Sequence, residues 1–180
     1  MVYDGVIEGR YVDLKSCAEE DAEFTLALRQ NPILTKYLPR LDISLQQQVA
    51  WIKKQRETAG DYFFVVWDKT ANPIGTVSIY DVTGETSESG RLALIGNAYE
   101  NTEASMLLFH FAFDILGLKE VRGYIVDGNK RADRYNRQFG CLTGEPEYTD
   151  TGETIRKTLI TDVSFHEAET RLQKLLYRSE

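Results

Sequence analysis

The sequence predicts an α/β (α+β) fold, with a mixed, strongly twisted sheet of six or seven strands and helices on both of its faces. Between residues 91 and 141, short apolar runs typical of buried strands alternate twice with stretches whose apolar residues recur at helical spacing. Strand-like segments and helix-start signals flank this region. With 180 residues, 42% hydrophobic and 27% charged, the chain suits one domain over residues 1–180.

The N-terminal third predicts one strand followed by three helices. Val12 and Leu14 alternate with charged residues, as in a strand with one buried face. A Ser-x-x-Glu capping sequence predicts a helix over 16–30, and a proline in the first turn suits a short helix over 32–37. A second capping sequence, Ser-x-x-Gln, opens a helix that ends at a glycine, over 44–60.

The segments at 61–68 and 74–82 are rich in β-formers and are joined by a turn, which predicts two antiparallel strands. The polar stretch 83–90 predicts a long hairpin loop at the mouth of a cleft. After residue 141, an extended segment with a hairpin tip at 150–152 precedes a last helix, for which Ser164-x-x-Glu supplies the capping sequence.

The central region predicts strand, helix, strand and helix in succession over 91–141. In this βαβα unit, both helix N-termini lie at one edge of the sheet. Unpaired N–H groups and a partial positive charge at such termini attract anions. The arrangement therefore predicts a cradle for a phosphate-bearing ligand.

Composition and charge argue against several classes of function. A net charge of −7 disfavours nucleic-acid binding, which needs Lys and Arg to neutralise phosphates, and mildly favours a cationic amine as partner. The sequence has no apolar run long enough for a bilayer and no signal-peptide pattern at its start, so we expect no membrane association and a cytoplasmic location. Cys17 and Cys141 predict no disulfide framework, and the absence of a His/Cys cluster with ligand spacing predicts no metal.

The sequence LALIGNAY…EASMLLFHFAFDILGLKEVRGYIVDGNKRADRYNRQFGC resembles the core of the GNAT acyl-CoA N-acyltransferase superfamily, particularly its RimJ/RimL-like branch. The flanking segments fit the family order, so the resemblance covers most of the chain. Its most specific part is helix-LGL-strand-xxxN-xxA-xxx(Y/N)-xxxGF, which here ends in Gly140-Cys141. After Gly96, the family's Gln/Arg-x-x-Gly-x-Gly/Ala loop, which wraps the coenzyme A pyrophosphate, is replaced by the shorter Asn97-Ala-Tyr-Glu-Asn-Thr-Glu-Ala104.

The resemblance implies transfer of an acetyl group from acetyl-CoA to a primary amine of a small molecule, an amino-sugar nucleotide or a protein N-terminus. Acetyl-CoA would be the co-substrate, and a small-molecule or peptide amine the partner of a monomer or homodimer. The altered loop leaves an alternative open, which is a GNAT-fold binding or interaction module with impaired catalysis.

Acyl transfer needs polarisation of the thioester carbonyl, and a backbone N–H near the end of the central strand suits that role, unless it makes an ordinary ladder hydrogen bond. The N–H groups at the following helix start would hold the pyrophosphate, unless this is simply a capped helix to which Glu100 and Glu103 add repulsive charge. Asn129 matches the family's pantetheine-contacting asparagine or is a helix cap, and Arg131 meets nucleotide phosphates or is solvated. The co-substrate candidates are thus Leu94, Ile95, Gly96, Asn101, Thr102, Glu103, Ala104, Asn129 and Arg131.

For the departing thiolate, the family places a tyrosine where this chain has Asn136, beside Tyr135, which is otherwise a packed aromatic. Glu88 and Asp81 are candidate acids near the cleft, Glu88 as general base and Asp81 at the acceptor, with solvated surface acids as the alternative. His110 is expected to be a satisfied core residue, and His166 to lie away from the cleft. The family's first helices cover the acceptor, so candidates for contacts there, or for core positions, are Tyr37, Leu38 and Trp51.

Overall fold

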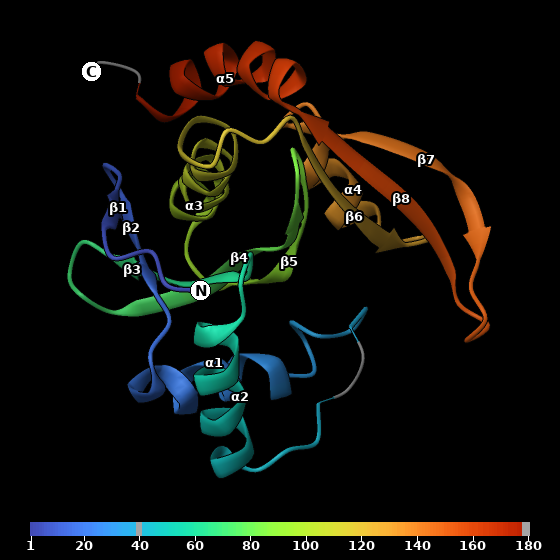
Figure 1. Cartoon of the computed structure of the whole chain (residues 1–180). Helices are drawn as coiled ribbons and strands as arrows, with labels where there is room; N and C mark the ends of the chain where they lie inside the picture. Colours follow the sequence, from blue (N-terminus) through green and yellow to red (C-terminus); the bar gives the residue numbers. More distant parts are fainter. Residues whose placement is uncertain (39–40, 178–180) are drawn as a thin grey trace.

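The computed structural model describes residues 1–38 and 41–177, and eight strands in these ranges form one mixed sheet (Figure 1). The predicted number was six or seven, and an extra short strand at the N-terminus makes the difference. Their order is β1-β2-β3-β4-β5-β6-β8-β7, and only β5 and β6 run parallel to each other. The strands are β1 (Val6–Glu8), β2 (Val12–Ser16), β3 (Tyr62–Asp68), β4 (Pro73–Thr83), β5 (Thr86–Leu94), β6 (Glu120–Val126), β7 (Leu142–Tyr148) and β8 (Thr154–Thr161).

Helices cover both faces of the sheet, as predicted, and β3 shows how its sequence directs this. Phe64 and Val66 are buried in the large core with α3 and α5, whereas Phe63 and Val65 are buried in a smaller core with α1 and α2. Figure 1 shows β3, β4 and β5 between these two pairs of helices. The helices are α1 (Ala22–Gln30), α2 (Leu45–Glu57), α3 (Ala98–His110), α4 (Lys130–Arg137) and α5 (Asp162–Leu176), with a 3₁₀ turn at Glu19–Asp21 and a π-helical turn at Phe111–Ile115.

One of the three helix starts predicted from capping sequences is correct, that of α2. Ser44 and Gln47 form the expected capping box of α2, with hydrogen bonds of 3.2 and 2.8 Å. Ser16, however, lies in β2 and bonds to the backbone of Tyr3, so it does not cap α1. The last helix begins earlier than predicted, because Thr161 caps it and Ser164 is its reciprocal partner.

Two predicted segments take a different form. Residues 32–37 make successive turns instead of a helix, because the Asn31 side chain accepts hydrogen bonds from the amides of Ile33 and Leu34. The stretch 83–90 is no long loop, since β4 and β5 pair as far as Thr83 and Thr86 around a tight turn at 84–85. Within 1–38 and 41–177, no helix has both the length and the apolar character needed to cross a bilayer.

A buried carboxylate joins α3 to the N-terminal strands and to the C-terminal end of the chain. Glu103 is fully buried. One of its oxygens accepts hydrogen bonds from the amides of Tyr11 and Val12, at 2.6 and 2.8 Å, and the other accepts from the Arg10 amide at 3.0 Å and the Tyr177 hydroxyl at 2.6 Å. This carboxylate is therefore a structural centre of the fold.

Candidate active site

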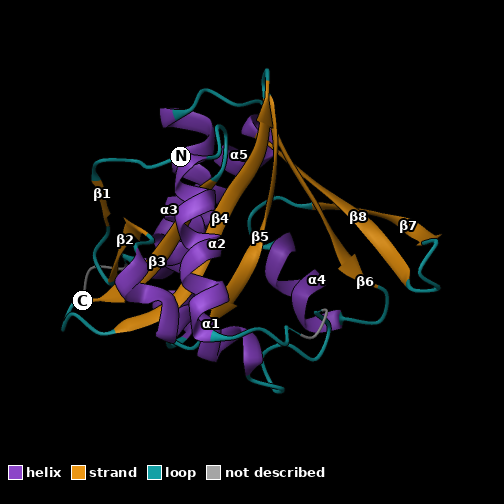
Figure 2. Ribbon diagram, turned by 60° about the horizontal axis from the view of Figure 1, so that its bottom comes forward, coloured by secondary structure: helices purple, strands orange, loops and turns teal. Residues whose placement is uncertain are grey.

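The two parallel strands separate from each other part-way along their length. Pairing between β5 and β6 covers only three residue pairs and ends at Glu88 and Arg122. Beyond that point β5 pairs only with β4, and β6 only with β8, and Figure 2 shows the two strands diverging. Each strand therefore presents unpaired backbone N–H and C=O groups to a wedge-shaped space, which we call the β5/β6 wedge.

A β-bulge in β5 borders the wedge. The register against β4 shifts between Thr76 and Ser78, and Arg91 takes a positive φ of 50°. The Thr76 hydroxyl donates to the Arg91 carbonyl at 2.8 Å, and the Ser78 hydroxyl donates to the Gly90 carbonyl at 3.1 Å. These bonds fix the bulge, so the backbone beside the wedge is held in one conformation.

The Arg91 side chain points to the smaller core, between the sheet and the helices α1 and α2, and makes several contacts there. Its guanidinium makes two bonds to the Asp61 carboxylate, at 2.6 and 2.9 Å, and lies over the rings of Tyr80 and Trp51 at 4.6 and 5.1 Å. Trp51 also makes an edge contact with Phe63 in the smaller core, and its role as an acceptor contact stays a prediction. Sequence reasoning missed the Asp61–Arg91 pair, because the two residues come from separate elements.

The start of α3 differs from the prediction. The helix begins at Ala98 with Asn97 as its cap, and the Asn97 side chain accepts from the amides of Tyr99 and Glu100 at 2.9 and 3.1 Å. The Glu100 carboxylate reciprocates by accepting from the Asn97 amide at 2.7 Å. This capping box occupies three donors at the helix N-terminus, where a pyrophosphate was expected.

The segment predicted to hold the pyrophosphate is therefore inside the helix. The Asn101 amide donates to the Asn97 carbonyl within the helix, and its side chain donates to the Gly96 carbonyl. Thr102 and Ala104 are buried, and Glu103 serves the N-terminal strands as described above. The helix already begins at Ala98, so the Asn101 amide is bonded within it and is not free for the predicted anion site.

Gly96 lets the Glu100 carboxylate lie directly over the backbone. A Cβ at this position would meet Glu100 Oε2 at 2.7 Å and the Ile74 side chain at 2.9 Å. The Ile95 amide donates to the Ile74 carbonyl at 2.9 Å, so it makes a ladder hydrogen bond, and Leu94 pairs with Gly75. Of the predicted carbonyl-polarising amides, that of Ile95 is thus already used.

At the other helix start, Asn129 caps α4, because its side chain accepts from the Ala132 amide at 3.1 Å. Arg131 is exposed in the first turn. A cavity of about 330 Å³ lies beside this turn, between α4, β6 and the β7–β8 hairpin. Two of its basic residues are paired, Arg156 with Asp127 at 2.6 Å and Arg137 with Asp133 at 2.9 Å, whereas Lys130 has no acidic partner within the described ranges.

Tyr135 ties α4 to α3. Its hydroxyl donates to the Asn101 carbonyl at 2.5 Å and lies 2.8 Å from the Ser105 hydroxyl, and burial raises the pKa of Tyr135. Asn136, next to it, is partly exposed, and its side chain makes no hydrogen bond to the described part of the chain. Asn136 is therefore the more accessible of the two predicted thiolate partners.

We expect Tyr135→Phe to lower the free energy of unfolding by about 1–2 kcal/mol, because the Asn101 carbonyl and the Ser105 hydroxyl lose a buried partner. Chemical denaturation measures this, with Tyr148→Phe, at a position 87% exposed, as the matched control. The value of kcat should stay within about threefold. A loss of a hundredfold in kcat at unchanged stability would contradict this and make the hydroxyl a proton donor.

Of the predicted acceptor-side residues, Asp81 and Glu88 lie near the tight turn that joins β4 to β5. Tyr37 and Leu38 lie in the turns that follow α1. Glu88 is partly exposed in β5, opposite Tyr80, whose pKa is raised to about 12 by burial and by the Glu88 charge. Asp81 is exposed with a positive φ of 52°. Tyr37 and Leu38 are exposed. These four side chains remain predicted contacts.

Comparisons with known proteins point in one direction. A family model described as the acetyltransferase (GNAT) domain matches residues 12–141. No curated protein matches the sequence closely enough to count as a relative. A solved GCN5-related N-acetyltransferase from Brucella melitensis has a TM-score of 0.82 at 18% identity, covering 98% of this chain and 87% of that one.

Two further solved structures are similar to this chain. The nucleotide-linked sugar GNAT FdhC, in its apo form, has a TM-score of 0.80 at 22% identity, covering 97% of this chain and 99% of that one. Spermidine N-acetyltransferase from Vibrio cholerae, in complex with CoA and spermine, has a TM-score of 0.79 at 15% identity, covering 88% and 99%. At these identities the likeness establishes a shared fold.

Proposed function

Because this chain belongs to the GNAT acetyltransferase domain family, and is thereby an acyl-CoA-dependent N-acetyltransferase, we propose that it acetylates a primary amine with acetyl-CoA as co-substrate. The acceptor is a small molecule, an amino-sugar nucleotide or a protein N-terminus. The β5/β6 wedge carries the proposal. We assign the chain to the RimJ/RimL-like branch, as one domain over residues 1–180 that acts in the cytoplasm as a monomer or homodimer.

The wedge suits the pantetheine arm of an acyl-CoA. This arm is extended and contains two amide groups, so it can pair with the free backbone groups of β5 and β6 in the way that an added strand would. In that position the thioester lies near the bulge, where a rigid backbone donor polarises its carbonyl. Asn136 donates a hydrogen bond to the departing thiolate, and Glu88 accepts the proton of the attacking amine.

An amine acceptor agrees with the charge of the chain and with the neighbouring structures. The net charge of −7 favours cationic partners. Two of the similar structures are a spermidine N-acetyltransferase and a nucleotide-linked sugar GNAT. Polyamines and amino sugars are therefore the first acceptors to test.

Calorimetry with acetyl-CoA, followed by a thiol-release assay, tests the proposal. We expect saturable binding below millimolar concentration and turnover with at least one member of a panel of polyamines, amino-sugar nucleotides and peptides with free N-termini. The absence of heat and of a thermal shift at millimolar acetyl-CoA would overturn the proposal.

The Asn97–Glu100 capping box favours a second candidate, a GNAT-fold binding module with impaired catalysis. It occupies the donors at the α3 N-terminus and adds a carboxylate there. Each lost hydrogen bond to a charged group is worth roughly 1.5–3 kcal/mol, so two lost donors weaken coenzyme binding by orders of magnitude. Binding of an amine without turnover on any acceptor would favour this candidate.

A further inference from the structure

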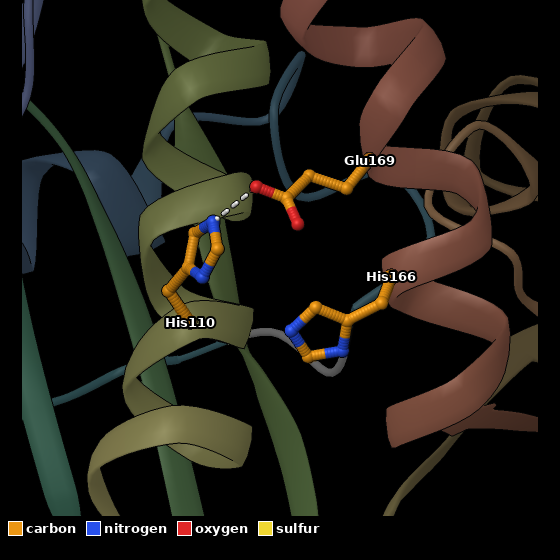
Figure 3. A group of neighbouring side chains, drawn as sticks. All are labelled: His110, His166 and Glu169. Carbon is orange, nitrogen blue, oxygen red and sulfur yellow. Dashed lines mark ion pairs between the residues drawn. The ribbon is translucent and has the colours of Figure 1, made fainter.

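Two histidines that are far apart in the sequence meet at the end of α3 that is opposite the wedge. His110 ends α3, and His166 and Glu169 lie on the facing surface of α5 (Figure 3). A ligand atom from each of these three side chains lies within 4.8 Å of the other two. At 1.5 Å per residue, the 13 residues of α3 put this group roughly 20 Å from the helix start. The group is therefore separate from the β5/β6 wedge.

The second nitrogen of each imidazole is already held by an oxygen. His110 Nδ1 lies 2.5 Å from Asp114 Oδ2, and His166 Nδ1 lies 2.8 Å from the Asp162 carbonyl. A carbonyl or carboxylate at Nδ1 orients a ring and keeps the proton there, which leaves Nε2 free as a metal ligand. Metal-binding histidines in proteins usually have such an oxygen at their other ring nitrogen.

Both Nε2 atoms face carboxylate oxygens. His110 Nε2 lies 2.9 Å from Glu169 Oε1, and His166 Nε2 lies 3.2 Å from Asp114 Oδ1. The lone pair of a neutral imidazole and a carboxylate oxygen repel each other at these distances, so a positive charge has to lie between them. A proton on each ring or one metal ion between the two rings supplies that charge.

The carboxylates in this group lack other cations. Lys119 pairs with Asp162 at 3.1 Å, but Asp114 and Glu169 have only histidines as ion-pair partners among residues 1–38 and 41–177. The Glu169 side chain is 13% exposed, which makes an uncompensated charge there costly. The surroundings favour a cation.

We propose that His110 Nε2, His166 Nε2 and a Glu169 oxygen bind one Zn²⁺ ion between α3 and α5, with water in the fourth position. Two imidazoles and a carboxylate are a ligand set that zinc accepts, at about 2.0–2.2 Å per bond. Asp114 orients the His110 ring, and the Asp162 carbonyl orients the His166 ring. The ion links the C-terminal helix to α3, and it stabilises the folded chain because the unfolded chain does not assemble the site.

Other soft donors in the described chain do not compete for zinc. Cys17 and Cys141 are both buried, and burial raises the pKa of each thiol, that of Cys141 to about 11. The amino group of Met1 donates to three backbone carbonyls. The two histidines are the only ones in the sequence. Within residues 1–38 and 41–177, these three side chains are the one group of His, Cys, Asp and Glu placed to hold a metal ion.

Titration of the tag-free, EDTA-treated full chain with ZnCl₂ tests the proposal. We expect one Zn²⁺ per chain at pH 7.5, a higher melting temperature with zinc, and no response to Mg²⁺ or Ca²⁺, which prefer oxygen ligands. His166→Ala and Glu169→Gln should each weaken zinc binding at least tenfold. Glu167→Gln, an exposed neutralisation on the same helix, is the matched control and should leave binding unchanged.

Co²⁺ in place of Zn²⁺ supplies a readout that a merely structural role of the histidines would not produce. We expect the visible absorption of a low-symmetry Co²⁺ site, lost in His166→Ala. Binding should also weaken as the pH falls from 8 to 5.5, because imidazoles must lose their protons to bind metal. Absence of zinc binding, or equal binding by His166→Ala, would overturn the proposal and leave the group as an ion-pair network between two helices.

Discussion

Glu103→Ala is expected to lower the free energy of unfolding by about 3–5 kcal/mol, the largest loss of stability among the substitutions considered. The change leaves the buried amide of Val12, the part-buried amides of Arg10 and Tyr11 and the hydroxyl of Tyr177 without their acceptor. An unsatisfied buried donor costs about 1–3 kcal/mol. Urea denaturation followed by circular dichroism measures the difference.

Further variants distinguish the loss of the carboxylate's charge and acceptors from the loss of its volume. Glu103→Gln keeps the size of the side chain but turns one acceptor into a donor that faces other donors, so we expect at least half of the loss seen with alanine. Tyr177→Phe removes one donor and should cost about 1 kcal/mol. Glu23→Ala, at an exposed site on α1, should change stability by less than about 0.5 kcal/mol. A loss below about 1 kcal/mol for Glu103→Ala would show that the amides find other acceptors.

Hydrophobic periodicity predicted the fold because it records burial directly. The alternation in β3 assigns Phe63 and Phe64 to different cores, and this is what a sheet with helices on both faces requires. Local chemistry was readable at one capping box, whereas the local boxes of Asn97 with Glu100 and of Thr161 with Ser164 were missed because those helices start earlier than predicted. The readable one is the Ser44–Gln47 capping box, because no competing partner reaches it.

The sequence patterns misplaced side chains whose hydrogen-bond partners come from a distant element of the fold. Ser16 had the sequence of a helix cap, but the backbone of Tyr3, which precedes β1, binds its hydroxyl. Glu103 looked like a charge beside a phosphate site, yet its partners lie about 90 residues earlier in the chain. Nothing in the local pattern encodes such long-range pairing, so propensity alone misplaces these residues.

The expectation of no metal site rested on spacing within the sequence. His110 and His166 are on different helices, so no short motif contains both. The available signal was local, namely His110 with Asp114 at i,i+4 and His166 with Glu169 at i,i+3, each of which puts a base and an acid on one helix face. Only the packing of α5 on α3 brings the two pairs together.

Glu100→Ala is expected to tighten acetyl-CoA binding by roughly 10- to 100-fold, if the pyrophosphate binds at the start of α3 as the family resemblance implies. The carboxylate of Glu100 lies over Gly96 and accepts from the Asn97 amide, so a pyrophosphate has to displace it. A unit charge about 4 Å from another costs about 1 kcal/mol in water and more near a protein surface, and a pyrophosphate carries two charges. Removing Glu100 therefore removes both a competitor and a repulsion.

The same substitution should lower stability by about 0.5–1 kcal/mol, because half of the capping box is lost. Tighter binding by a less stable protein distinguishes the prediction from a general improvement of the fold. Calorimetry at two ionic strengths measures the effect, whose electrostatic part shrinks at high salt. Glu167→Gln makes the same change in charge on α5 and should leave the affinity unchanged.

An unchanged affinity in Glu100→Ala would place the pyrophosphate elsewhere, and the cavity beside α4 is the alternative that the described residues offer. The cavity beside α4 contains Lys130, which has no acidic partner within the described residues, in the first turn after the Asn129 cap. Lys130→Gln would then weaken acetyl-CoA binding, whereas with the pyrophosphate at α3 it should have little effect. The pair of variants assigns the anion site because each removes one charge of opposite sign from one helix start: a gain with Glu100→Ala supports α3, and a loss with Lys130→Gln supports α4.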